Sequence, residues 1–255
     1  MTAKKNAKAS AKAEPVYFDK AGKRIDGRKA DEVRPIKIQV GVIPRAAGSA
    51  YLEWGQNKII ASVHGPRECL PKHKANPYKA VVEFMYRMAG FSVPDHKNPR
   101  PGRREIEIGK VCGEALERAI FVERFPNTKI DVNVEILDSN AGTRVAALTA
   151  AAVAVADAGI PMRDMVSACG VGKFGGKVAA DLNKYEEDAD DAVDIPMATL
   201  PNTGEIVLLQ LDGLLKANEW QECIKLGTKA CADVYEIQKA ALKKRYESTG
   251  KEAMK

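Results

Sequence analysis

Alternation of apolar and polar residues dominates the first half of the chain and predicts a strand-rich sheet. The predicted strands cover residues 35–42, 50–54, 58–64, 80–88 and 128–137. Only Gly55-Gln56-Asn57 separates the second from the third, which predicts a hairpin. Helical spacing appears instead at 103–122 and in the Ala-rich stretch 144–158, which Gly159 and Pro161 close.

A second group of strands is predicted at 165–171, 177–181, 193–199 and 205–211. A long helix with one apolar stripe follows, and its Lys/Glu-rich end from Lys243 is expected to fray. This order predicts an α+β fold of two similar halves, about 24–160 and 161–255, with mixed or antiparallel sheets packed on helices. Residues 1–23, rich in Lys and Ala, are expected to form a mobile basic tail.

Composition restricts the class of protein. The chain has 255 residues, of which 45% are hydrophobic and 29% charged, as in ordinary globular proteins. No apolar run approaches the roughly 18 residues of a membrane span, and the N-terminus lacks the apolar stretch of a secretory signal. We therefore expect a cytoplasmic protein without membrane contact. Five widely spaced cysteines with no CxxC pair argue against a disulfide framework and a structural zinc site.

Charge is distributed unevenly along the chain. Residues 1–29 hold nine Lys and Arg against three Asp and Glu, a surplus of six that equals the net charge of +6. Residues 67–104 carry nine basic side chains against three acidic ones, whereas residues 181–194 carry seven acidic side chains against Lys184 alone. The pattern indicates a track for a polyanion and a separate carboxylate site, although charge runs also form solvated faces.

Gly142-Thr143-Arg144 lies where a predicted strand gives way to a helix. A helix N-terminus favours a bound anion, and Gly142 would let the backbone approach it closely. Thr143 adds a hydroxyl donor and Arg144 a planar fork that matches phosphate. The same residues suit an ordinary helix cap, so spacing alone leaves both interpretations open.

Two further segments carry chemistry. Arg103 and Arg104 enter a helix from a Pro-rich loop, where one can grip a phosphate while the other follows a nucleic-acid backbone. The alternative is a solubilising loop. Residues 181–188 cluster carboxylates at a strand end, an arrangement that suits a general acid, Mg²⁺ ligands or an acidic surface turn.

These segments belong to a longer series of motifs that resembles a known family. The motifs are Arg24-Ile25-Asp26-Gly27-Arg28, Gly48-Ser49-Ala50, Gly65-Pro66-Arg67-Glu68, Arg103-Arg104-Glu105-Ile106-Glu107-Ile108, Gly142-Thr143-Arg144 and Asp181-Leu182-Asn183-Lys184. Their order and spacing resemble the ribonuclease PH family over nearly the full chain. Within that family the sequence is more similar to the catalytic ring subunits of archaeal exosomes.

The resemblance implies a phosphate-dependent 3′→5′ exoribonuclease. Inorganic phosphate, the co-substrate, attacks the last phosphodiester of single-stranded RNA and releases a nucleoside diphosphate, and the reverse reaction adds a tail. The residues implied to hold phosphate are Arg104, Gly142, Thr143 and Arg144. Those implied to contact RNA are Arg67 and Arg103, with Lys72 and His73 on a loop that lines a pore.

The same resemblance assigns the catalytic acids. Asp181 and an acidic partner would handle the proton on the leaving 3′ oxygen, alone or with Mg²⁺. The family places its second acid six residues after the first, where this chain has Glu187, and the turn holds one extra residue. We assign the second role to Asp188, with Glu187 as the alternative.

The resemblance also implies partners. A ring of three heterodimers would alternate this subunit with a non-catalytic sister subunit, under RNA-binding cap proteins. Two alternatives remain. The first is the RNA-binding sister subunit, which is expected to lack the phosphate arginines and the acids together. The second is a homohexameric ribonuclease PH that trims tRNA 3′ ends. The Arg103-Arg104 pair and the Lys-rich N-terminal extension argue against the homohexamer.

Overall fold

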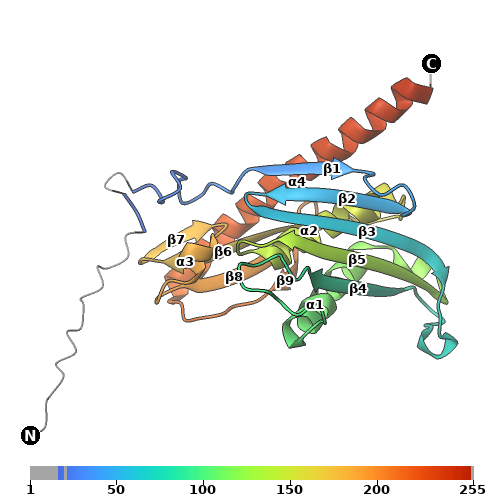
Figure 1. Ribbon diagram of the computed structural model, residues 1–255, viewed down its shortest axis with the longest axis horizontal. Helices are drawn as coiled ribbons and strands as arrows, with labels where there is room; N and C mark the ends of the chain where they lie inside the picture. Colours follow the sequence, from blue (N-terminus) through green and yellow to red (C-terminus); the bar gives the residue numbers. More distant parts are fainter. Residues whose placement is uncertain (1–16, 20–21, 254–255) are drawn as a thin grey trace, which may run out of the picture.

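Strands of two β-sheets pack against the Ala-rich helix α2 (Thr143–Asp157) in the computed structural model, which describes residues 17–19 and 22–253 (Figure 1). One sheet has the order β1-β2-β3-β5-β4. Its strands are β1 (Ile36–Val40), β2 (Gly48–Trp54), β3 (Asn57–Glu68), β4 (Val81–Met88) and β5 (Thr128–Asp138). All its pairs are antiparallel except β4 with β5, so the sheet is mixed.

The second sheet, of order β7-β6-β8-β9, is antiparallel throughout. Its strands are β6 (Ser167–Phe174), β7 (Lys177–Ala180), β8 (Val193–Leu200) and β9 (Glu205–Leu209). The other helices are α1 (Arg103–Ala119), α3 (Lys184–Glu187), α4 (Ala217–Ala253) and two short 3₁₀ turns at Lys72–Lys74 and Val122–Arg124. The predicted α+β class with mixed and antiparallel sheets is confirmed.

Helix α2 is buried on nearly all sides because small side chains let strands from both halves approach it. Its Ala residues from Ala146 to Ala154 are fully buried. A Cβ atom at Gly48 of β2 would lie 2.2 Å from the carbonyl oxygen of Ala154, so only glycine allows this crossing. The C-terminal end of α2 is thereby packed directly against β2.

Two helix boundaries differ from the predictions. α1 ends at Ala119, because Ile120 adopts an extended conformation and bonds in a β-bridge with Met162. α4 continues past Lys243, where fraying was predicted. The Tyr246 hydroxyl donates to the carbonyl of Asp157 at 3.3 Å, and this tertiary contact supports the last turns of α4 in spite of their charge.

Most of the predicted tail lies outside the described residues, but Tyr17 and Phe18 are described and packed. Their rings lie 5.9 Å and 5.1 Å from the ring of Phe174. The packed chain therefore starts before the predicted boundary at residue 23. Across the described helices, none combines the length and apolar character needed to cross a membrane.

Candidate active site

The loop between β5 and α2 presents the predicted phosphate residues. Ala141 and Gly142 have φ angles of 54° and 66°, and this left-handed pair turns the chain into α2. A helix of this length leaves its first N–H groups free to bind an anion. Arg144 forms an ion pair with Glu107 of α1, with 2.9 Å between Nη2 and Oε2, which fixes its orientation. Gln210 donates to the other carboxylate oxygen of Glu107 at 2.8 Å.

A small cavity gathers these residues. Its volume is about 40 Å³, and it is lined by Arg104, Gly142, Thr143, Arg144, Val145, Gly170, Glu187, Asp194 and Pro196. A water molecule needs ~10–15 Å³ on this measure, so the cavity is larger than a single water molecule requires. The four residues predicted to hold phosphate therefore meet in one place.

A larger cavity of about 520 Å³ adjoins the small one. The two share Arg104, Arg144, Glu187, Asp194 and Pro196, and the larger adds Glu107, Gln210, Leu211 and Asp212. Arginines, carboxylates and a few apolar side chains thus line a continuous hollow. Arg103 is exposed at the start of α1 and lines neither cavity.

Glu187 and Asp194 bring two carboxylates to this hollow from different elements. Glu187 ends α3 and Asp194 lies on β8. Burial raises the pKa of Asp194 to about 6, and the negative charges of Glu187 and Asp212 add to this, while Arg144 and Arg104 oppose it. A carboxyl with such a pKa can hold a proton near neutral pH.

Asp181 occupies a different environment from the one predicted. Its side chain is 1% exposed and lines neither cavity. Oδ2 accepts from the backbone N of Arg34 at 2.7 Å, from Arg34 Nε at 2.9 Å and from Trp54 Nε1 at 2.9 Å. Oδ1 accepts from Arg34 Nη2 at 2.6 Å. Burial alone would raise the pKa of Asp181, but Arg34 lowers it below the ordinary value, so this carboxylate stays charged and paired.

Asp188 also lies away from the hollow. Its carboxylate is exposed and ion-paired with Lys184. Of the predicted catalytic acids, Asp181 is thus buried and paired with Arg34, and Asp188 is exposed. Glu187, the alternative to Asp188, is the one that lines the cavity. Asp194, which was not predicted, is the second carboxylate of the hollow; a lone Asp between Val193 and Ile195 in an apolar strand was the available signal.

The predicted Mg²⁺ ligands do not fit a metal ion, since Asp181 is saturated by Arg34 and Trp54 while Asp188 is paired on the surface. Within residues 17–19 and 22–253, no group of three or more His, Cys, Asp or Glu side chains is arranged to hold one.

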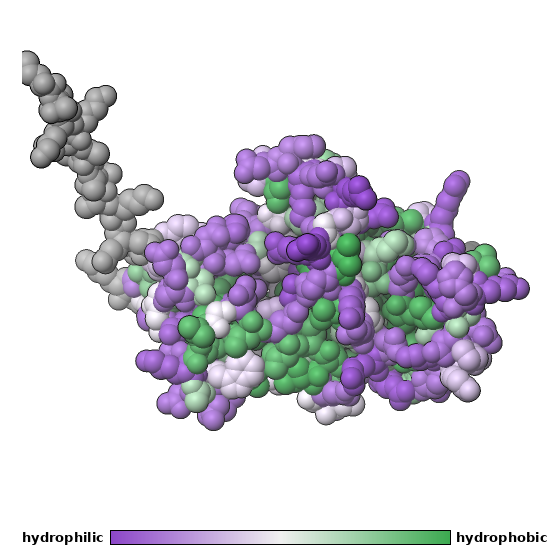
Figure 2. All heavy atoms as spheres, turned by 90° about the horizontal axis from the view of Figure 1, so that it is seen from below, coloured by the Kyte–Doolittle hydropathy of each residue, from purple (hydrophilic) through white to green (hydrophobic). Residues whose placement is uncertain are grey.

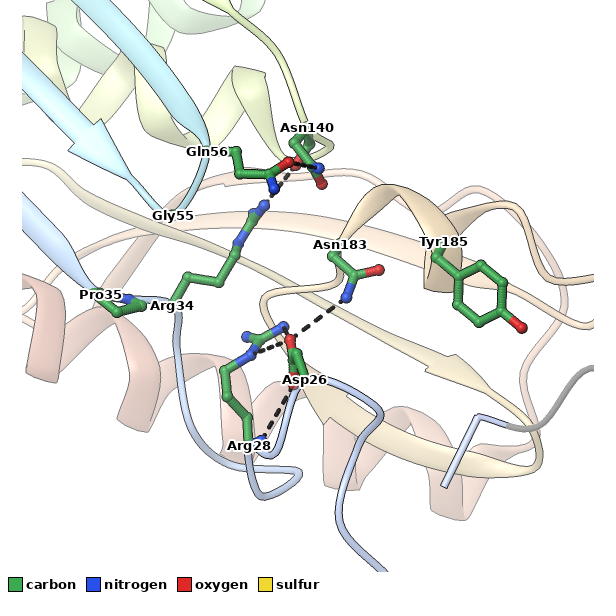
Figure 3. Close-up of a pocket in the computed structure, with 9 residues that line it drawn as sticks. All are labelled: Asp26, Arg28, Arg34, Pro35, Gly55, Gln56, Asn140, Asn183 and Tyr185. Atoms are coloured by element: carbon green, nitrogen blue, oxygen red, sulfur yellow. Dashed lines mark hydrogen bonds and ion pairs between the residues drawn. The ribbon is translucent and has the colours of Figure 1, made fainter. Parts of the chain in front are cut away.

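The N-terminal segment before β1 connects the two loops of the site. Arg34 binds Asp181 and also donates to the carbonyl of Ala141, just before Gly142. It donates to the carbonyl of Asn140 as well (Figure 3). Arg24 donates to the carbonyl of Asp181 at 2.8 Å and forms a buried ion pair with Glu186. The sequence signalled Arg24 and Arg28 only as part of a family motif, because their partners lie some 150 residues away.

The predicted RNA contacts form a second group. Arg67 is 60% exposed and ion-paired with Asp131, and Lys72 and His73 lie exposed in the turn after β3. β3 begins at Asn57, which holds the loop at Asn140, and its 12 residues span roughly 35 Å. The basic group therefore lies at the opposite end of the sheet from the phosphate residues (Figure 1).

Comparison with known proteins shows one family along most of the chain. The model of the 3′ exoribonuclease family, domain 1, matches residues 32–161, and that of domain 2 matches residues 164–230. The chain is 53% identical over 229 residues to the exosome complex component Rrp41 of Pyrococcus abyssi, across 90% of this chain and 92% of that protein. It is 55% identical over 225 residues to Rrp41 of Methanopyrus kandleri, across 88% and 94%.

Solved structures show the same fold at lower identity. Rice (Oryza sativa) Rrp46 superimposes with a TM-score of 0.78 at 24% identity, covering 86% of this chain and 100% of that one. A chain of the Archaeoglobus fulgidus exosome with RNA bound to the active site gives a TM-score of 0.72 at 22% identity, covering 85% and 92%.

The environment of Asp181 predicts a role in stability. Asp181→Asn should lower the free energy of unfolding by about 3 kcal/mol, because it leaves the buried Arg34 charge without its anion. The folded pKa of Asp181 is lowered, so its contribution is complete above the ordinary value of 3.8 and is lost as the pH falls through the folded pKa. Urea denaturation at several pH values measures this. Asp188→Asn, on the surface, is the matched control and should change stability by less than about 0.5 kcal/mol.

Proposed function

Because this chain belongs to the 3′ exoribonuclease (ribonuclease PH) family, we propose that it is the phosphorolytic subunit of an archaeal exosome. It would shorten single-stranded RNA from the 3′ end with inorganic phosphate as co-substrate. The observation that carries this proposal is the small cavity in which Arg104, Arg144 and the N-terminus of α2 face two carboxylates. The non-catalytic sister subunit would be expected to lack this set.

The cavity residues divide the reaction between them. Arg104, Arg144 and the N–H groups at Gly142 and Thr143 hold the attacking phosphate and balance its charge. A phosphate oxygen bonds to the phosphorus of the last phosphodiester, and the bond to the 3′ oxygen of the preceding nucleotide breaks. The products are a nucleoside diphosphate and an RNA shortened by one nucleotide.

The leaving 3′ oxygen needs a proton, and we assign its supply to the carboxylate pair of Glu187 and Asp194. Asp194 holds the proton because burial and the charge of Glu187 disfavour its ionised form. The larger cavity would take the terminal nucleoside, with Pro196 and Leu211 against its apolar surface. The reverse direction uses the same groups with the proton moving back.

Assembly with other subunits is part of the proposal. β9 is an edge strand, and it and the segment after it expose Ile206, Leu209, Leu211 and Leu214. Figure 2 shows a face on which apolar side chains gather between hydrophilic margins. Exposed apolar surface beside an open strand edge favours association. We assign the partners as a sister subunit in a ring of three heterodimers, with RNA-binding cap proteins, and Arg67, Lys72 and His73 along the RNA path.

The reaction should be phosphorolysis. Incubation of the protein and its sister subunit with single-stranded RNA should release nucleoside diphosphates only when phosphate is supplied, because the arginine cavity binds an anion and not a water nucleophile. Chromatography of the products distinguishes the two reactions. Nucleoside monophosphates formed in phosphate-free buffer would refute the proposal.

The arginines should separate into two classes. Arg104→Ala and Arg144→Ala should abolish turnover and spare much of the RNA affinity, because both line the small cavity. Arg67→Ala, at the far end of the sheet, should weaken RNA binding and reduce its salt dependence. Arg103→Ala should act like Arg67→Ala. Binding titrations at several salt concentrations, with turnover measured in parallel, test this, and identical behaviour of all four variants would contradict it.

The carboxylate pair predicts a pH dependence. kcat/KM for phosphorolysis should fall as the pH rises through about 6, since the protonated form of Asp194 is the donor. Asp194→Asn should lower the rate roughly a hundredfold. Glu187→Gln removes a negative neighbour and should shift the titration of Asp194 to lower pH, which ¹³C NMR of the carboxyl group measures.

Asp188→Asn is the control for this pair, since its carboxylate lies outside the cavity. It should leave both the rate and the titration of Asp194 unchanged. If Asp188→Asn lost activity while Glu187→Gln kept it, the assignment of the acid would return to Asp188.

A further inference from the structure

A buried tyrosine hydroxyl lies directly behind the phosphate cavity. Tyr86 is on β4 and is only 2% exposed. Its hydroxyl is bonded to Thr143 Oγ1 at 2.9 Å. Thr143 is the first residue of α2 and lines the small cavity with Arg104 and Arg144. Tyr86 thus touches a phosphate-binding residue without reaching the cavity itself.

The direction of this hydrogen bond follows from the chemistry of the two hydroxyls. Burial raises the pKa of Tyr86 to about 12, so the phenol keeps its proton at neutral pH. A threonine hydroxyl has one hydrogen to donate and two lone pairs that accept. If Tyr86 donates, the single hydrogen of Thr143 is left for another acceptor. If Thr143 donated to Tyr86, it would turn lone pairs toward the anion and repel it.

We propose that Tyr86 is a positioning residue for inorganic phosphate: it donates its hydroxyl hydrogen to Thr143 Oγ1 and so directs the Thr143 hydrogen to a phosphate oxygen. This inference rests on the proposed phosphorolytic function. The cavity then holds the anion with two guanidinium groups, the helix N-terminus and one hydroxyl that acts only as a donor toward it. The strand β4, at the edge of the first sheet, thereby takes part in phosphate recognition.

Tyr86→Phe removes only the hydroxyl and keeps the ring in the core. The KM for phosphate should rise about tenfold, because a hydrogen bond to a charged group is lost or misdirected for part of the time. The KM for RNA should stay within about twofold, since Tyr86 lies on the phosphate side. Calorimetric titration of the full chain with inorganic phosphate alone should show the same tenfold loss without any turnover.

Tyr235→Phe is the matched control. The Tyr235 hydroxyl on α4 donates to Asp164 at 3.0 Å and accepts from Asn202 at 2.8 Å, and none of these residues lines the hollow. Both variants lose a bonded phenol, so a merely structural effect would appear in each. Only Tyr86→Phe should change phosphate affinity.

Thr143→Val tests the other end of the same hydrogen bond. It should raise the KM for phosphate at least as much as Tyr86→Phe, and Tyr86→Phe should add nothing in the Thr143→Val background. If Tyr86→Phe folds poorly, Thr143→Val alone remains a test, because it leaves Tyr86 in place: unchanged phosphate affinity in Thr143→Val would show that the Thr143 hydroxyl gives phosphate no hydrogen bond. Unchanged phosphate affinity in Tyr86→Phe, or additive effects in the double variant, would overturn the inference. Failure of the wild-type protein to use phosphate would instead reject the proposed function.

Discussion

The buried ion pair between Arg34 and Asp181 is the contact on which the geometry of the site depends. Two charges taken out of water cost much more than their attraction returns unless further hydrogen bonds satisfy them. Here the carboxylate accepts from Arg34 and from Trp54, and the guanidinium also donates to the carbonyl groups of Asn140 and Ala141. The pair therefore specifies one arrangement of the loop between β5 and α2 in the first half against the end of β7 in the second.

The segment from Asp181 to Glu187, which leads into and includes α3, is held by the same N-terminal segment. Arg24 forms a buried ion pair with Glu186 and donates to the backbone at Asp181. In a helical turn successive residues point about 100° apart, so anchoring Glu186 inward turns Glu187 toward the cavity. Two adjacent glutamates thus have different surroundings: Glu186 is the buried partner of an arginine, and Glu187 lines the cavity.

The protonation state of the carboxylates in the hollow depends on the arginines and carboxylates that line it together. Arg104 and Arg144 favour the ionised carboxylates, whereas burial and mutual repulsion disfavour them, and for Asp194 the second effect is the larger. Glu107 holds Arg144 in place and is itself held by Gln210 of the second half. Both halves therefore contribute to the orientation of Arg144, one of the arginines that line the small cavity.

The sequence by itself determined the α+β class, the hairpin at Gly55, the Ala-rich helix and the turn at Gly142 to Arg144 from which that helix starts. These depend on periodicity and turn chemistry within a few residues, and α2 could be predicted because alanines suit a helix crossed closely by strands. Only the tertiary structure decided which carboxylates line the cavity with Arg104 and Arg144. Asp181, Glu187 and Asp194 have similar chemistry, and their roles are set by partners such as Arg34, which is 147 residues from Asp181. Spacing along a chain contains no information about such a partner, because burial and pairing arise only when the two halves pack together.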